Sequence, residues 1–301
     1  MKAVWSFWTK PFRSRGTWVW TSQKHHLLSW VLSVERARLH YPHTSLYTDD
    51  EGAGMLVEGI GLHFDHVSTN LNELEDADPG WWALGKIWTY ALQTEPFVHI
   101  DSDVFLWKPL PEDVVQADIL IQNPEHFSRG ALFYRPEVLE SAIHGVPGGW
   151  MPEEWVWYRS NGAGQQGECC GVFGGRRVDF IKHYARQALK LINHPANQTA
   201  LQAMGDKSEH MTLIEQFFLS ACIQYHQQRE DSPHRGLTVA YLFNSMDEAF
   251  NSVNASRLGY THLLAGAKRN HDITDKLERR VKMDYPAQYE RCLRYVGQHI
   301  D

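Results

Sequence analysis

The stretch "PFVHIDSDVFLWKPLP", residues 96–111, places two carboxylates directly after a run of apolar residues. Residues 96–100 are apolar except for His99 and predict a buried strand, and apolar residues resume after Asp103. Asp101 and Asp103 are therefore expected at the end of that strand, with both side chains on one side. A divalent cation between them would remove the cost of burying two unpaired carboxylates, so the spacing predicts Mg²⁺ or Mn²⁺. The alternative is a solvated turn in which Asp103 caps nearby backbone.

The residues before this stretch predict strands that alternate with helices. Strands are expected at 3–8, 44–52 and 62–67, and helices at 21–40 and 81–94. This alternation is typical of an α/β protein with mostly parallel strands in one twisted sheet. Ligands of such sheets bind beyond the carboxyl ends of the strands, where the two aspartates are expected.

The pattern becomes less regular after residue 111. Strands are expected at 117–122, 130–136, 237–243 and 259–266, helices at 176–203 and 211–228, and a helical tail follows. Residues 145–168 are rich in Gly, Pro and Trp and predict a long functional loop. Its aromatic residues would form a lid or a platform for a ring-shaped ligand. We expect a single domain with halves at 1–111 and 112–270 and a helical tail at 271–301.

Composition excludes some classes of function. The 301 residues are 43% hydrophobic and 22% charged, as in an ordinary soluble globular protein. The net charge is −7 and the basic residues are scattered, which argues against nucleic acid as a partner. No apolar run approaches the roughly 18 residues of a membrane span, and the amino terminus lacks a signal-peptide pattern. A cytoplasmic location is therefore expected.

The four cysteines show no CxxC spacing, which argues against a zinc site or a disulfide framework built from them. This usage favours a reducing compartment. Cys169 and Cys170 are adjacent and are interpreted as small buried residues rather than as a strained vicinal disulfide.

Several motifs resemble those of glycosyltransferases with the GT-A fold. "WWALGKIWTYALQTEPFVHIDSDVFLWKPL" (81–110) is similar to the helix, strand and Asp-x-Asp motif of the glycogenin-like and lipopolysaccharide-galactosyltransferase-like group. "THLLAGAKRN" (261–270) resembles that group's His-x-x-Gly-x-x-Lys signature. "LIEQFF" (213–218) resembles its Asp-Gln pair, and "FSRGALFYRP" (127–136) its glycine-containing segment beneath the sugar pocket. The resemblance implies a Rossmann-like, mostly parallel sheet flanked by helices. It also implies transfer of a sugar from a nucleoside diphosphate sugar, with UDP favoured, to a saccharide or other acceptor. Residues 1–111 would then be the nucleotide-binding half and residues 112–270 the acceptor half, whose aromatic loop would form the lid or the acceptor platform.

The resemblance implies a metal and diphosphate site. Asp101, Asp103 and His262 would hold Mn²⁺ or Mg²⁺, which neutralises the leaving diphosphate. Lys268 would contact the diphosphate, and Ser102 lies within the motif.

Other residues are expected around the donor. Lys86 would meet the sugar nucleotide, Trp5 or Trp8 would lie near the base, and Thr48 or Asp49 would lie near the base or ribose. Two residues, Glu215 and Gln216, would lie near the reacting carbon. An inverting enzyme needs a base at the acceptor hydroxyl, for which Glu168 is the candidate, whereas the resemblance favours retention.

The sequence departs from the signature in places. Gly266 follows His262 by four residues rather than three, and Arg269 and Asn270 replace the Pro-Trp pair of the group. "CCGVFGG" (169–175) is similar to a strand end of blood-group-type transferases. The opening "MKAVWSFWTKPF" is similar to the start of a poorly characterised group of bacterial proteins.

Three other functions are compatible with parts of the sequence. A haloacid-dehalogenase-type phosphatase would carry its Asp-x-Asp on the first strand, with Thr or Val where this chain has Phe105. A sugar-nucleotide pyrophosphorylase would need a Gly-rich basic loop after the first strand. The segment there, "WTKPFRSRG", contains only one Gly, which disfavours this function. A non-catalytic sugar- or nucleotide-binding protein is the third, because a fold does not guarantee activity.

Overall fold

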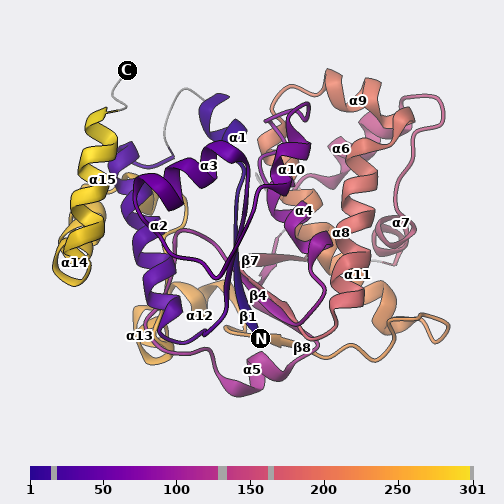
Figure 1. Cartoon of the computed structure of the whole chain (residues 1–301). Helices are drawn as coiled ribbons and strands as arrows, with labels where there is room; N and C mark the ends of the chain where they lie inside the picture. Colours follow the sequence, from indigo (N-terminus) through magenta and orange to yellow (C-terminus); the bar gives the residue numbers. More distant parts are fainter. Residues whose placement is uncertain (15–18, 128–133, 162–165, 299–301) are drawn as a thin grey trace. The chain divides into compact units, whose positions relative to one another are not determined.

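The computed structural model describes residues 1–14, 19–127, 134–161 and 166–298. The chain is an α/β protein of helices and strands (Figure 1). Its elements belong to two units. The first unit comprises Met1–Asp76, Val98–Pro111 and Asn251–Asp301, and the second comprises Ala77–Phe97 and Glu112–Phe250. The chain passes from the first unit to the second after Asp76 and again after Pro111, and it returns to the first unit at Val98 and at Asn251.

The first unit contains strands in the order β3-β2-β1-β4 and a separate pair, β5-β9. Its strands are β1 (Lys2–Phe7), β2 (Thr44–Thr48), β3 (His66–Ser68), β4 (Phe97–Ile100), β5 (Val104–Leu106) and β9 (Tyr260–His262). The first residue of β4, Phe97, is assigned to the second unit. Its α-helices are α1 (Thr9–Ser14), α2 (Gln23–Arg38), α3 (Asp50–Ala53), α13 (Ser252–Leu258), α14 (His271–Asp284) and α15 (Pro286–Gln298). Its other helical turns are η1 (Gly54–Gly59), η2 (Asn70–Leu74) and η5 (Ala265–Arg269).

The second unit contains strands in the order β7-β6-β8. These are β6 (Ile119–His126), β7 (Gln166–Gly175) and β8 (Val239–Tyr241). Its α-helices are α4 (Leu84–Leu92), α5 (Glu112–Gln116), α6 (Pro136–His144), α7 (Glu153–Ser160), α8 (Val178–Asn193), α9 (Gln198–Ala203), α10 (Lys207–Thr212), α11 (Phe218–Gln228) and α12 (Met246–Phe250). Its other helical turns are η3 (Pro195–Asn197) and η4 (Leu213–Phe217).

Strand pairing confirms the α/β class that the sequence predicts. β1 pairs in parallel with β2, β2 with β3, and β6 with β8, whereas β6 and β7 are antiparallel. The strands are thus mixed and mostly parallel, with helices between them in the chain. Among the described residues, no helix has the length and apolar character needed to cross a membrane.

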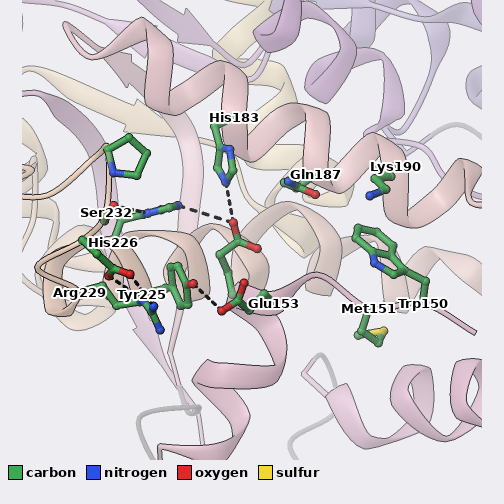
Figure 2. Close-up of a pocket in the computed structure, with 13 residues that line it drawn as sticks. Trp150, Met151, Glu153, His183, Gln187, Lys190, Tyr225, His226, Arg229 and Ser232 are labelled. Carbon is green, nitrogen blue, oxygen red and sulfur yellow. Dashed lines mark hydrogen bonds and ion pairs between the residues drawn. The ribbon is translucent and has the colours of Figure 1, made fainter.

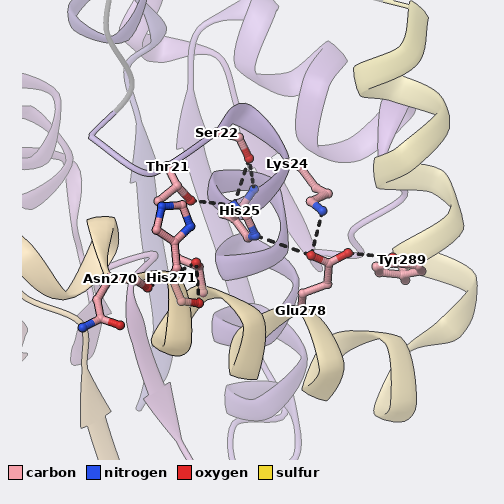
Figure 3. Close-up of polar contacts among 9 residues, drawn as sticks. Thr21, Ser22, Lys24, His25, Asn270, His271, Glu278 and Tyr289 are labelled. Carbon is pink, nitrogen blue, oxygen red and sulfur yellow. Dashed lines mark hydrogen bonds and ion pairs between the residues drawn. The ribbon is translucent and has the colours of Figure 1, made fainter.

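The carboxy-terminal helices of the first unit pack against α2, which is near the start of the chain (Figure 3). Glu278 on α14 accepts hydrogen bonds from Lys24 Nζ at 2.7 Å and from Tyr289 OH at 2.8 Å. His25 Nε2 lies 3.5 Å from the same carboxylate, and its Nδ1 contacts Thr21 and Ser22. One carboxylate therefore links α2, α14 and α15.

Several predicted boundaries are wrong, and each error has a local cause. The strand expected at 44–52 ends at Thr48, because Asp49 caps α3 by accepting from Gly52 N. The helix expected at 176–203 is interrupted, because His194 is extended before Pro195. The strand expected at 259–266 ends at His262, and a 3₁₀ turn begins at Ala265.

Two further predictions concern the middle of the chain. The loop expected at 145–168 contains helix α7 and the start of β7, and Trp155 and Tyr158 are buried in the core of the second unit. Of the strand expected at 130–136, residues 130–133 lie outside the described residues and Pro136 begins α6.

Candidate functional site

The Asp-x-Asp motif lies in a turn between two strands of the first unit. All residues of β4 are buried, and Val104 N donates to Asp101 O at 3.0 Å where the chain turns into β5. β5 pairs antiparallel with β9, and this register places Val104 opposite His262. Leu263 N also donates to Asp103 O at 3.0 Å. Backbone pairing thus brings His262 to the aspartates from about 160 residues further along the chain.

Three side chains converge at this turn. Asp103 Oδ1 lies 3.4 Å from His262 Nε2, and ligand atoms of Asp101, Asp103 and His262 all lie within 4.8 Å of one another. His99 Nδ1 lies 3.5 Å from Asp101 Oδ1. Two carboxylates and one imidazole at this spacing are a donor set that fits a divalent cation such as Mn²⁺. Ser102 is half-buried between the two aspartates.

A lysine adds positive charge to the cluster. Lys268 on η5 places Nζ 2.5 Å from Asp103 Oδ2, and Asp103 is 6% exposed. Burial would raise the pKa of the Asp103 carboxyl, but Lys268 and His262 outweigh it and hold the pKa well below its usual range. Asp103 is therefore a carboxylate over the whole physiological pH range.

The residues expected at the nucleotide base and ribose are packed into the first unit. Trp5 has no exposed surface and donates from Nε1 to Ser33 Oγ at 3.0 Å. Thr48 is also buried and donates to Phe7 O. Asp49 accepts from Thr9 N at 2.7 Å and from Gly52 N at 2.8 Å, which gives it a structural task as a helix cap.

Lys86 and Glu215, which the sequence places on separate helical segments, form an ion pair inside the second unit. Lys86 Nζ lies 2.8 Å from Glu215 Oε1 and donates to Cys170 O at 2.9 Å. Glu215 is 1% exposed and lies in the π-helical turn η4. Such turns are frequent at functional sites. The neighbouring Gln216 accepts from Tyr134 OH.

Glu168 on β7 is a buried carboxyl group of the second unit. Its Oε1 accepts from Ser220 Oγ at 2.7 Å and from Gln166 Nε2 at 2.9 Å, with Tyr241 OH at 3.3 Å. Oε2 has no hydrogen-bond partner among the described residues. Burial raises the pKa of Glu168 to about 7, although these hydrogen bonds oppose the shift. A carboxyl group with this pKa can give or take a proton near neutral pH.

A sequence model of one protein family matches residues 1–295, which is nearly the whole chain. The chain belongs to DUF6734. DUF6734 is described as a family of unknown function. A search of curated proteins finds no match to this DUF6734 sequence.

This DUF6734 chain contains a second cluster that the sequence analysis missed. Glu154, His183 and His226 lie on three different helices of the second unit, and ligand atoms of all three lie within 4.8 Å of one another. They are separated by 29 and 43 residues (183 − 154 and 226 − 183), so no short motif marks them. The only sequence signal is the abundance of histidine, at 17 residues.

Proposed function

We propose that the chain is a metal-dependent glycosyltransferase of the GT-A type. It would transfer a sugar from a nucleoside diphosphate sugar, with UDP favoured, to a saccharide acceptor. The observation that carries the proposal is the convergence of Asp101, Asp103 and His262 in the first unit, with Lys268 on Asp103. The sequence resemblance assigns these same four residues to the metal and the diphosphate.

The donor set supports Mn²⁺ over Mg²⁺. Mg²⁺ prefers oxygen ligands only, whereas Mn²⁺ also accepts an imidazole nitrogen. Asp101, Asp103 and His262 would hold the metal, which when bound neutralises charge on the departing diphosphate.

The chain's own residues would prepare this site. The β5–β9 pairing holds His262 beside Asp103, so little side-chain freedom is lost when a ligand binds. Lys268 contacts Asp103 Oδ2, whereas the other oxygen, Oδ1, makes the 3.4 Å contact with His262. Its ammonium group would stabilise negative charge on a phosphate oxygen. Roles for Lys86, Glu215 and Gln216 at the donor sugar stay predictions, as does the role of Glu168 as an acceptor-side base.

The first test is calorimetric titration of UDP into the full chain, with and without Mn²⁺. We expect binding that requires Mn²⁺ and that is weakened more than about 100-fold in Asp103→Asn, because even the loss of a residue that only hydrogen-bonds a metal ligand costs about 10–100-fold in metal affinity. Asp275→Asn is the matched control, since Asp275 is exposed on α14 of the same unit and loses the same charge. Thermal melting would show that both variants fold.

Incubation with UDP-sugars and Mn²⁺ then separates an enzyme from a binding protein. Release of UDP that depends on Asp103 supports the transferase. Metal-dependent UDP binding without sugar release from any donor tested favours the non-catalytic alternative. Nucleotide binding that is equal in Asp103→Asn and Asp275→Asn would contradict the proposed site.

A further inference from the structure

A pocket of about 540 Å³ lies among helices of the second unit (Figure 2). Glu154 on α7, His183 on α8 and His226 on α11 all line it. Figure 2 shows the rings of His183 and His226 directed from two sides toward one carboxylate, which is that of Glu154. None of these residues belongs to the site proposed above.

The three side chains are close enough to share one ion. His183 Nε2 lies 2.6 Å from Glu154 Oε1, and His226 Nε2 lies 3.6 Å from the same oxygen. Glu154 is 5% exposed and His226 is 4% exposed. A carboxylate and two imidazoles therefore meet in a largely buried place that opens into the pocket.

Hydrogen bonding alone leaves this cluster incomplete. The distance from His226 Nε2 to Glu154 is too long for a hydrogen bond, and Nε2 is buried with no hydrogen-bond partner among the described residues. The other ring nitrogen, Nδ1, lies 2.6 Å from Ser232 Oγ. When Nδ1–H donates to Ser232, the lone pair of Nε2 is directed toward the carboxylate, and a cation between them would satisfy both.

We propose that Glu154, His183 and His226 bind a divalent transition-metal ion of the zinc class. Two imidazoles and one carboxylate form a donor set typical of Zn²⁺ and its neighbours, and hard ions such as Mg²⁺ disfavour it. The contact between Ser232 and His226 is the outer hydrogen bond that a metal-bound histidine usually makes.

The pocket gives the ion an open side. Three protein ligands leave a tetrahedral Zn²⁺ with one position for water or another ligand. Lys190 and Arg229 also line the pocket, and Lys190 Nζ lies 4.1 Å from the centre of the Trp150 ring. Arg229 is paired with Asp231, with Nη2 2.9 Å from Oδ2, so the positive charge that favours an anionic additional ligand, such as a carboxylate or phosphate, comes from Lys190.

The test is a titration of the chelator-treated full chain with Co²⁺, followed by visible absorption, and then displacement of Co²⁺ by Zn²⁺. Titrations in the Asp103→Asn background weaken metal binding at the other cluster, so that binding there does not obscure the result. We expect one Co²⁺ to bind per chain and to give tetrahedral ligand-field bands. The variant His183→Ala should weaken the affinity for Co²⁺ more than about 100-fold. His183 is partly exposed, so this variant is expected to fold.

Two further variants sharpen the result. Glu154→Gln should weaken binding to a similar degree, and Ser232→Ala by about 10-fold through loss of the outer hydrogen bond. His144→Gln is the control, because His144 is an exposed imidazole of the same unit. Equal affinities in His183→Ala, Glu154→Gln and His144→Gln would overturn the proposal, as would the absence of Co²⁺ and Zn²⁺ binding in the Asp103→Asn chain.

Discussion

Glu168 shows how surroundings change the chemistry of one side chain. The residue is 1% exposed, and only one of its two carboxyl oxygens accepts hydrogen bonds from described residues. Burial disfavours the charged form, which raises the pKa of Glu168 from its ordinary value of 4.5 to about 7. The folded protein therefore holds a proton at Glu168 over a pH range in which the unfolded chain has released it.

This shift predicts that Glu168 stabilises the fold less as the pH rises. The raised pKa contributes stability in full below about pH 4.5, and this contribution is lost as the pH approaches and passes about 7. We expect the free energy of unfolding of the wild type, relative to that of Glu168→Gln, to fall by about 3 kcal/mol between acid pH and pH 8. Urea unfolding of both proteins at several pH values would measure this difference. A difference that does not vary with pH would contradict the assignment.

The pKa of Asp103 shifts in the opposite direction, because the positive charge of its partners outweighs the effect of burial. Lys268 Nζ at 2.5 Å and His262 Nε2 at 3.4 Å favour the charged form. The same backbone position without these neighbours would carry a carboxyl group with a raised pKa. The Asp-x-Asp pattern alone could not predict this balance, because both partners come from the far end of the chain.

Helix α4 and the π-helical turn η4 are joined by a buried ion pair within the second unit. Lys86 and Glu215 are both buried, and their contact at 2.8 Å is close but not aligned as a hydrogen bond. Such a pair is strongly coupled, because removal of one partner leaves an uncompensated charge in the interior.

We expect Lys86→Met to lower the free energy of unfolding by about 3–5 kcal/mol, because Glu215 is left buried without its cation. The double variant Lys86→Met/Glu215→Met should lose clearly less, since no isolated charge remains. Lys182→Met on α8 is a control with the same charge change at a half-buried position. Urea unfolding of the wild type, Lys86→Met, Glu215→Met, the double variant and Lys182→Met measures the coupling. Additive losses from Lys86 and Glu215 would show that the pair is not coupled.

Helices show which local patterns were predictable. The apolar spacing of α2 and α4 predicted helices close to those observed at Gln23–Arg38 and Leu84–Leu92. Helix α7 was missed, because Gly and Pro flank it and its Trp residues were interpreted as ligand-binding. Trp155 instead packs against Phe217 and donates to Glu140. Composition could not distinguish an aromatic core from an aromatic platform.

In the first unit, helix α2 from the beginning of the chain packs against the carboxy-terminal helices α14 and α15. Lys24 on α2 and Glu278 on α14 are 254 residues apart in sequence and 2.7 Å apart in space (Figure 3). Loop-closure entropy must be overcome to form such a contact, so it depends on the packing of α14 and α15 as a whole.

We expect Glu278→Gln to lower the free energy of unfolding by about 1 kcal/mol, because a partly exposed carboxylate loses its charge-assisted bonds to Lys24 and Tyr289. Hydrogen exchange should become faster in α14 and α15, which are held by these bonds. Glu290→Gln on α15 removes the same charge from an exposed position and serves as the control. Unchanged exchange in both helices would show that the Glu278 contacts do not hold them.

The sequence was sufficient for the α/β class, for most helices and strands, and for the expectation that Asp101 and Asp103 follow a buried strand. These features depend on local periodicity, which the burial of one face of an element imposes on neighbouring residues. The sequence resemblance had placed His262 and Lys268 at the site of Asp101 and Asp103, and in the structure these side chains lie together. The tertiary structure alone decided the direct pairing of Lys86 with Glu215 and the meeting of Glu154 with His183 and His226. Those contacts result from the packing of whole helices and strands, and residues that packing brings together need share no spacing in the sequence.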